Sequence, residues 1–199
     1  MQIIDEKDPS AAEIAQKILV AGEVFAFATD TVFGLAADAS NPEAINKIYQ
    51  LKKRDFSKPI AIFAKDVESA KKIFIFDKKS EEIAAKYLPG PLTMVLKTNQ
   101  NAAGFLAKNL NLNGDNFIGF RVVANPFLEN LFEKFSGFLA VTSANISGKN
   151  AATTSLEVIQ QIPEITLIVD GKITHGIAST VVKIDNEIIN VIRKGPIEL

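Results

Sequence analysis

Helical and strand-like patterns alternate along the whole of this chain, and that alternation limits its fold more than any other feature. Ser10 and Glu13 have the spacing of a capping box, which predicts a helix that ends at Gly22. Residues 24–28, Val-Phe-Ala-Phe-Ala, then have the continuous apolar character of a buried strand. Because the same alternation continues toward the C-terminus, we expect an α/β fold.

The later segments extend this pattern. Further helices are expected from Asn41-Pro42 to Arg54, at 66–74 with Asp66 as N-cap, at 80–87 with Ser80 as N-cap, from Asn125-Pro126, and near 155–161. Further strands are expected at 59–63, 92–97, 117–122, 138–142 and 165–169. The stretches 181–184 and 187–192, around Asp185-Asn186, are typical of an antiparallel hairpin, which makes the predicted sheet mixed. A loop is expected over 99–116, which is rich in Asn and Gly.

The composition is that of an ordinary globular protein. Apolar residues make up 47% and charged residues 23% of the 199 positions, and no linker, repeat or low-complexity tract divides them. We therefore expect one domain over residues 1–199. The N-terminus lacks the basic start and apolar stretch of a signal peptide, and the apolar runs are strand-length, so we expect a cytoplasmic protein without membrane segments.

The residue inventory excludes several kinds of chemistry. Cysteine is absent, which rules out disulfides, thiolate zinc sites and cysteine nucleophiles, and His175 is the one histidine. His175 stands beside a glycine without an evident carboxylate partner, so we expect it at the surface and not in catalysis. The net charge of −1 does not indicate nucleic-acid binding, so an anionic partner must be held by a local cluster of Lys and Arg.

Such a cluster follows the helix predicted after Asn41. Lys52, Lys53, Arg54 and Lys58 lie within seven residues, and together they can balance a triphosphate. The alternative is a solvated helix end, since the helix dipole favours cations in any last turn.

Two strand ends carry runs of small and hydroxyl-bearing residues. Residues 29–39 (TDTVFGLAADA) follow a buried strand with Gly34 in the expected turn, and residues 141–154 (VTSANISGKNAATT) follow another. Ligands commonly bind beyond strand ends in α/β sheets, and such loops can form an anion nest. The alternative at both places is a plain turn with local side-chain hydrogen bonds.

Arg121 interrupts an otherwise apolar strand, between Phe120 and Val122. Burying an unpaired guanidinium would cost several kcal/mol, so Arg121 needs an anion. The sequence leaves open whether that anion is an internal Asp or Glu or the carboxylate of a ligand. Near the C-terminus, Ser179, Thr180 and Arg193 lie at the edges of the predicted hairpin, where Arg193 could reach a phosphate or remain in solvent. Neither a P-loop nor a GxGxxG turn is present.

Taken in order, these segments resemble the YrdC/TsaC family of threonylcarbamoyl-adenylate synthases. The resemblance spans nearly the whole chain and rests on TDTVFGL (29–35), LKKRDFSKPI (51–60), PGPLTMVL (89–96), IGFRVVANP (118–126), TSANISG (142–148), GIASTVV (176–182) and VIRKG (191–195). It implies a twisted α/β fold with a large concave cavity lined by positive charge. This sequence has Asp30 where many members have Glu, Phe63 where some have His, and Asn125 where His is frequent.

The resemblance also implies a reaction and a set of roles. The enzyme would be a nucleotidyltransferase that makes threonylcarbamoyl-adenylate and pyrophosphate from ATP, L-threonine and bicarbonate, for tRNA modification, and Mg²⁺ would accompany ATP. Lys52 and Arg54 would be the catalytic cations. The residues implied for ATP are Lys52, Arg54, Lys58, Ser143, Asn145, Thr153 and Arg193, and those implied for threonine are Thr31, Arg121 and Ser179. The product would pass to a threonylcarbamoyl transferase.

Two alternatives use the same cations differently. A non-catalytic module could clamp the phosphate backbone of tRNA or double-stranded RNA in the basic cavity. A carbamoyl-handling domain of the kind found in hydrogenase maturation proteins normally sits in a far longer chain with zinc-finger cysteines, which are absent here. Protein ligands for Mg²⁺ are not identified by the sequence; Asp30, Asp38 and Asp170 are candidates by residue type alone.

Overall fold

A mixed ten-stranded sheet dominates the structure, a computed structural model that describes residues 1–111 and 114–199. The strand order is β1-β8-β2-β3-β7-β4-β6-β5-β9-β10. The strands are β1 (Gln2–Asp5), β2 (Phe25–Ala28), β3 (Phe33–Asp38), β4 (Ala61–Phe63), β5 (Leu92–Lys97), β6 (Phe117–Arg121), β7 (Leu139–Ser143), β8 (Leu167–Asp170), β9 (Thr180–Asp185) and β10 (Ile188–Arg193). Parallel and antiparallel pairs both occur, so the predicted α/β fold with a mixed sheet is confirmed.

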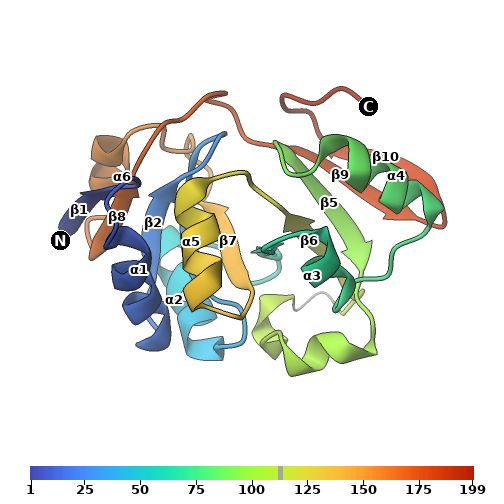
Figure 1. The fold of residues 1–199 in the computed structure, drawn as a ribbon, viewed down its shortest axis with the longest axis horizontal. Helices are drawn as coiled ribbons and strands as arrows, with labels where there is room; N and C mark the ends of the chain where they lie inside the picture. The colour runs from blue at the N-terminus through green and yellow to red at the C-terminus, as the bar shows by residue number, and fades with distance from the viewer. Residues whose placement is uncertain (112–113) are drawn as a thin grey trace.

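The helices connect these strands and cover the sheet. They are α1 (Ala11–Val20), α2 (Pro42–Lys52), α3 (Val67–Lys71), α4 (Lys78–Tyr87), α5 (Pro126–Lys134) and α6 (Ser155–Gln161), with the 3-10 turns η1 (Gln100–Gly104) and η2 (Lys108–Leu110). In the view of Figure 1, α1, α2 and α5 lie near β2 and β7, α6 lies near β8 at the left edge, α3 lies next to β6, and α4 lies in front of β9 and β10. None of the helices in the described ranges is long and apolar enough to cross a membrane.

Two clusters of buried hydrophobic side chains hold the helices against the sheet. One joins the inner faces of α1 and α5 to the sheet through Leu19, Phe127 and Leu131, which pack with Phe25 and Phe27 of β2. The other contains the apolar face of α2 and most of the remaining buried side chains. Burial of these large side chains supplies the main driving force for folding, about 1.5 to 3 kcal/mol for each one fully removed from water.

Local signals explain most helix starts. The side chain of Asn41 accepts hydrogen bonds from the N–H groups of Glu43 and Ala44, and Asn125 caps α5 in the same way through Leu128 N–H, as the sequence predicts. Asp66 caps α3 as expected. The predicted capping box of α1 is wrong, because Ser10 Oγ donates to Asp8 Oδ1 and leaves the helix end without a side-chain cap.

Three boundaries differ from the prediction. The helix α4 begins at Lys78, since Asp77 is its N-cap and Ser80 is the third residue of that capping box. The helix α3 ends at Lys71 because Phe74 and Ile75 turn away to bond with the end of β5. Gly34 lies inside β3 opposite Phe27 and not in a turn, and a side chain there would meet Phe27 and Val141.

The closing hairpin forms as predicted, with its turn one residue later. Asn186 and Glu187 have positive φ angles of 50° and 64°, the pairing required by a two-residue turn between strands of right-handed twist. The register places Ile188 opposite Asp185. The predicted loop over 99–116 contains η1 and η2, and its residues 112 and 113 lie outside the described part of the chain.

Candidate functional site

A cavity of about 570 Å³ opens on one face of the sheet. It is bounded by the β2–β3 connection, the segment between α2 and β4, and strands β4, β5, β6, β7, β9 and β10. Its charged lining residues are Arg54, Asp115, Arg121, Lys183 and Arg193, and its hydroxyl-bearing residues are Thr29, Thr31, Thr93, Thr142, Ser143 and Ser179. Four cations against one carboxylate make the lining positive, so the cavity suits anionic ligands.

Strand register separates the polar groups into two ends. Thr93 of β5 lies opposite Val181 of β9, which lies opposite Arg193 of β10. We call this end of the cavity the hydroxyl end. Its polar side chains are those of Thr31, Thr93, Arg121, Ser179 and Arg193. Lys183 lies opposite Val95, two residues farther along β9.

The other end, called here the lysine end, consists of Arg54, Asp115, Phe117, Ser143 and Lys183. Because β4 runs parallel to β6 with Ile62 opposite Phe120, Pro59 lies at the level of Phe117. Phe117 and Arg121 are four residues apart on β6, so the two ends are separated by about 13 Å.

At the hydroxyl end, the anion that Arg121 requires is Asp30. Arg121 Nη2 donates to Asp30 Oδ1, Nη1 donates to Thr31 Oγ1 at 2.9 Å, and Nε donates to the Gly90 carbonyl at 2.9 Å. The Arg121 side chain is 4% exposed and that of Asp30 is 22% exposed. The internal carboxylate that the sequence left open is therefore present; its side chain is partly exposed, although it does not line the cavity.

A second chain of hydrogen bonds completes this end. Arg193 Nε donates to the Ser179 carbonyl at 3.0 Å and Nη2 to Ser179 Oγ at 3.2 Å, and Ser179 Oγ lies 2.8 Å from Thr93 Oγ1. The backbone holds Arg193 in place, since the chain after it packs so closely on Ala178 and Thr180 that Gly195 has no space for a side chain. Arg193 is thus hydrogen-bonded to Ser179 and lines the cavity, although the residue remains exposed to solvent.

At the lysine end, Arg54 faces the cavity. Its Nε donates to the Lys58 carbonyl at 3.2 Å and Nη2 to the Pro59 carbonyl at 3.0 Å. No carboxylate pairs with Arg54 in the described part of the chain, and burial lowers the pKa of its guanidinium. A partly buried cation without a counter-charge is a good partner for a phosphate.

Lys52 differs sharply from Arg54 although they are two residues apart. It is 1% exposed and does not line the cavity. Its Nζ donates to the Ser143 carbonyl, to the Asn145 carbonyl at 2.9 Å and to Asn145 Oδ1 at 3.0 Å. Burial lowers the pKa of Lys52 to about 7. Lys52 therefore supports the loop that begins at Ser143, from behind the cavity wall.

Of the other residues predicted to bind ATP, some line the cavity and some do not. Ser143 lines the cavity and donates through Oγ to Asn145 Oδ1, while Asn145 is buried and does not line it. The Lys58 side chain is exposed outside the cavity, and its carbonyl accepts from Arg54 and Tyr49. Thr153 is also outside the cavity, and its N–H and Oγ1 donate to Glu157 Oε2.

The cavity thus brings together six of the ten predicted residues: Thr31, Arg54, Arg121, Ser143, Ser179 and Arg193. Sequence reasoning missed Thr93, Asp115, Phe117 and Lys183. The alternation along β9 could have placed Lys183 on the same strand face as Val181, but the sequence contains no signal that this face borders a cavity.

Carboxylates are sparse in this cavity. Of the three candidates by residue type, Asp30 pairs with Arg121, Asp38 accepts from Ser40, and Asp170 accepts from Ser155 and Gly171. None of these three lines the cavity, whereas Asp115 does. Within residues 1–111 and 114–199, no group of three or more His, Cys, Asp and Glu could hold a metal ion.

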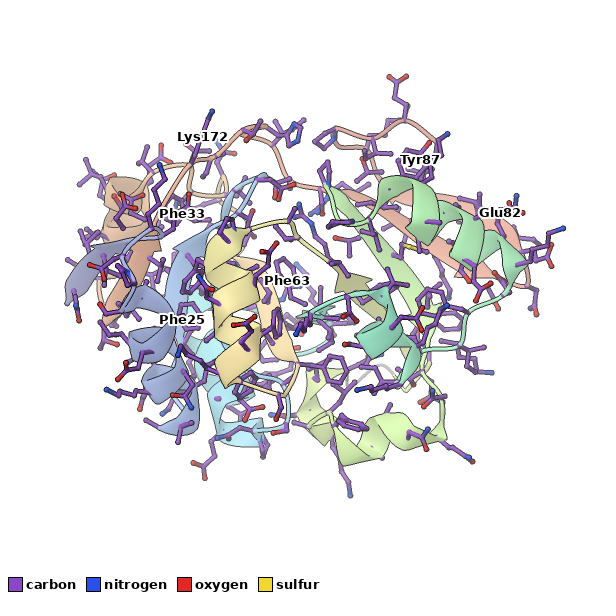
Figure 2. All side chains as sticks on the ribbon, in the orientation of Figure 1. Phe25, Phe33, Phe63, Glu82, Tyr87 and Lys172 are labelled. Carbon is purple, nitrogen blue, oxygen red and sulfur yellow. The ribbon has the colours of Figure 1, made fainter. Side chains whose placement is uncertain are left out.

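The departures from the family pattern have local explanations. Phe63 packs edge-on against Phe27, and its ring lies 5.7 Å from the Arg121 guanidinium carbon, on the cavity wall. Figure 2 shows Phe63 near the centre of the molecule, between Phe25 on one side and Tyr87 on the other. Asn125 caps α5 and donates to Glu6. As expected, His175 is exposed, and its backbone N–H donates to the Asp30 carbonyl at 2.9 Å.

Comparisons with known proteins point to one family. The family model Sua5/YciO/YrdC, described as "Telomere recombination", matches residues 17–195. A relative from Methanocaldococcus jannaschii is 32% identical over 200 residues, covering 100% of this chain and 92% of its own length. A Pseudoalteromonas atlantica protein named threonylcarbamoyl-AMP synthase is 33% identical, with 79% of this chain and 88% of its own length covered.

A solved structure agrees with these relatives. Sua5 from P. abyssi complexed with L-threonine superposes with a TM-score of 0.86 at 28% identity, covering 98% of this chain and 58% of that one. Several curated relatives are also longer: the chain spans 53% of the Bos taurus threonylcarbamoyl-AMP synthase, to which it is 34% identical.

Proposed function

Because this chain belongs to the Sua5/YciO/YrdC family, we propose that it is a threonylcarbamoyl-AMP synthase. The reaction joins L-threonine, bicarbonate or CO₂, and ATP into L-threonylcarbamoyladenylate and releases pyrophosphate, which makes the enzyme a nucleotidyltransferase. Its product serves the threonylcarbamoyl modification of tRNA in the cytoplasm, through a transferase that accepts the activated threonine. The names of the relatives favour this function over a non-catalytic RNA-binding module.

One observation carries the proposal: cationic side chains line both ends of one cavity, Arg121 and Arg193 at the hydroxyl end and Arg54 and Lys183 at the lysine end. The reaction needs this arrangement because its two organic reactants, a carbamate and a triphosphate, repel each other in water. Cations held around one cavity offset that repulsion and place the reactants side by side.

The hydroxyl end suits the amino acid. A carboxylate can accept hydrogen bonds from Arg121, which lines the cavity, while the partly exposed Asp30, outside that lining but paired with Arg121, adds a negative charge that attracts the ammonium group. The ion pair therefore matches the two charges of a free amino acid. Thr31 and Ser179 supply hydroxyls beside it, within reach of the threonine side chain.

The lysine end suits the nucleotide phosphates. Arg54 and Ser143 face the cavity there, while Arg193 lies beside Ser179 at the hydroxyl end. Lys52 and Asn145, which sequence resemblance places on ATP, are assigned to holding Ser143 in position. Lys58 contributes its carbonyl, which orients Arg54, and Thr153 anchors the start of α6.

The chemistry then follows from position and charge. The neutral amine of threonine adds to CO₂ and loses a proton, which gives the carbamate. A carbamate oxygen forms a bond to the α-phosphorus of ATP, and the bond from that phosphorus to the bridging oxygen breaks. Pyrophosphate leaves with the electron pair, and the neighbouring cations stabilise its charge. No protein nucleophile takes part.

Mg²⁺ fits this site as a companion of ATP. It prefers oxygen ligands and is often held by phosphates, water and one or two carboxylates. Asp115 is the carboxylate that lines the lysine end, and hydrogen bonds from Asn111 and the Phe117 N–H hold its Oδ1. When bound, the ion would neutralise part of the charge on the phosphates.

Pyrophosphate release tests the proposal directly. The wild-type protein should release pyrophosphate from ATP when threonine and bicarbonate are both present, and serine or valine should not replace threonine. Release that is independent of threonine would contradict the function. RNA binding that falls steeply with salt and ignores threonine, without pyrophosphate release, would instead support the RNA-binding module.

A further inference from the structure

Lys183 is a cavity cation that the proposed roles above leave unused. It lies on β9 opposite Val95 of β5, and its side chain is half-buried in the cavity lining. Val95 in turn lies opposite Gly119 of β6, and Lys183, Val95 and Gly119 all line the cavity.

An aromatic ring supports this lysine. Lys183 Nζ lies 3.6 Å from the centroid of the Phe117 ring, close enough for a strong cation–π contact. Phe117 is held in turn at the start of β6, where its N–H donates to Asp115 Oδ1 and its carbonyl accepts from Asn111. The ammonium group is thus fixed at the lysine end and does not move freely in solvent.

Lys183 also lacks the partners that other lysines have. Lys17, Lys47, Lys71 and Lys79 each form an ion pair with a glutamate on the surface. Over residues 1–111 and 114–199, Lys183 has neither an ion pair nor a hydrogen bond; the Asp115 carboxylate is near enough to interact electrostatically but is not within 4.0 Å. Three N–H donors therefore remain for a ligand.

We propose that Lys183 binds the β- and γ-phosphates of ATP, facing Arg54 from the opposite wall of the cavity. The inference rests on the proposed function, which puts threonine at Arg121. The carbamate must meet the α-phosphorus near that end, so the outer phosphates extend toward the lysine end, about 13 Å from Arg121. Lys183 then stabilises the charge that pyrophosphate gains as it leaves.

Calorimetry with pyrophosphate, ATP, AMP and threonine as separate ligands tests this role. Lys183→Gln should weaken the binding of pyrophosphate and of ATP by about tenfold or more, because it removes a charged contact. The affinities for AMP and for threonine should stay the same. Lys183→Arg, which keeps the charge, should recover most of the pyrophosphate binding.

Lys86 provides a matched control. It lies on α4, outside the cavity, with its Nζ 4.8 Å from the Tyr87 ring centroid, so Lys86→Gln removes the same charge and the same kind of contact. Its pyrophosphate affinity should equal that of the wild type. Thermal melts of all variants check that they fold.

Two results would overturn the assignment of Lys183. Unchanged pyrophosphate affinity in Lys183→Gln would remove it from the site, and equal weakening of AMP and ATP would move it to the α-phosphate or the nucleoside. If the wild type binds pyrophosphate but releases none from ATP and threonine, the proposed function fails, while the comparison of Lys183→Gln with the wild type still decides the phosphate contact.

Discussion

Arg121 on β6 and Asp30 in the β2–β3 connection form a partly buried ion pair across 91 residues of sequence. The adjacent Thr31 accepts from the same guanidinium, so one short connection holds both terminal nitrogens of the arginine. The backbone carbonyl of Asp30 also accepts from the N–H groups of Thr174 and His175. The ion pair therefore ties together the two segments that flank the hydroxyl end.

Asp30→Asn should separate the structural role of this pair from its role toward a ligand. Asparagine keeps the size of the side chain but removes the charge that compensates Arg121. We expect a loss of about 1 to 3 kcal/mol in the free energy of unfolding, because a buried guanidinium loses its counter-ion. Added threonine should stabilise the variant through its carboxylate, and thermal melts with and without threonine measure both effects. Equal stability of variant and wild type would contradict the buried pair.

Arg121→Ala should weaken saturation by threonine and leave ATP binding near its wild-type value. The lost charged contact corresponds to about ten- to a hundredfold in the threonine dissociation constant. Calorimetry with each substrate measures the two affinities separately. The reverse result, with ATP weakened and threonine unchanged, would reassign Arg121 to the nucleotide.

Arg54→Ala should lower kcat/KM for ATP by about ten- to a hundredfold, since it removes a charge-assisted contact worth about 1.5 to 3 kcal/mol. Lys53→Ala is the matched control. Lys53 is the exposed neighbour at the end of α2 and does not line the cavity. A steady-state pyrophosphate assay compares the variants. Normal turnover of ATP by Arg54→Ala, or an equal loss in Lys53→Ala, would argue against the role of Arg54.

The sequence predicted those parts of the fold that depend on near neighbours in the chain. Caps such as Asn41 and Asn125, and the apolar periods of the strands, are local patterns, so α5 and β5 form where expected and α2 begins where expected, although it ends at Lys52 and not at Arg54. The errors at Ser10 and Ser80 concern which of several nearby polar side chains caps a helix end. Nearly equivalent local hydrogen bonds compete there.

The site depends on tertiary relations that no local pattern contains. Lys52 and Arg54 belong to one charged run, yet Lys53 adopts a left-handed conformation with φ of 49° between them and turns the chain. One cation is therefore buried behind the wall while the other lines the cavity. Lys183 likewise becomes a site residue only because the sheet brings β9 beside β5.

The last prediction concerns Lys52 and pH. Three oxygen atoms accept hydrogen bonds from Lys52 Nζ, and only the protonated ammonium has three donors. Burial lowers the pKa of Lys52 from 10.5 to about 7, so the protonated form dominates below about pH 7 and is lost above it. Deprotonation should loosen Ser143 and Asn145, and with them the cavity wall at the lysine end.

We therefore expect the ratio of wild-type kcat/KM for ATP to that of Lys52→Met to fall as pH rises through about 7. Lys52→Met lacks the titrating group, so taking the ratio cancels the pH dependence of threonine and bicarbonate. A ratio that does not change with pH would contradict the supporting role of the ammonium.

Stability should change in the opposite direction. The pKa of Lys52 is lower in the folded protein than in the unfolded chain, so the unfolded chain binds more protons between about pH 7 and 10.5. Over that range, the free energy of unfolding of the wild type should therefore rise with pH relative to that of Lys52→Met. Melting curves of both proteins across the same pH range test this. A fall in the activity ratio together with a rise in relative stability would show that the loss of activity comes from the loop behind Ser143 and not from unfolding.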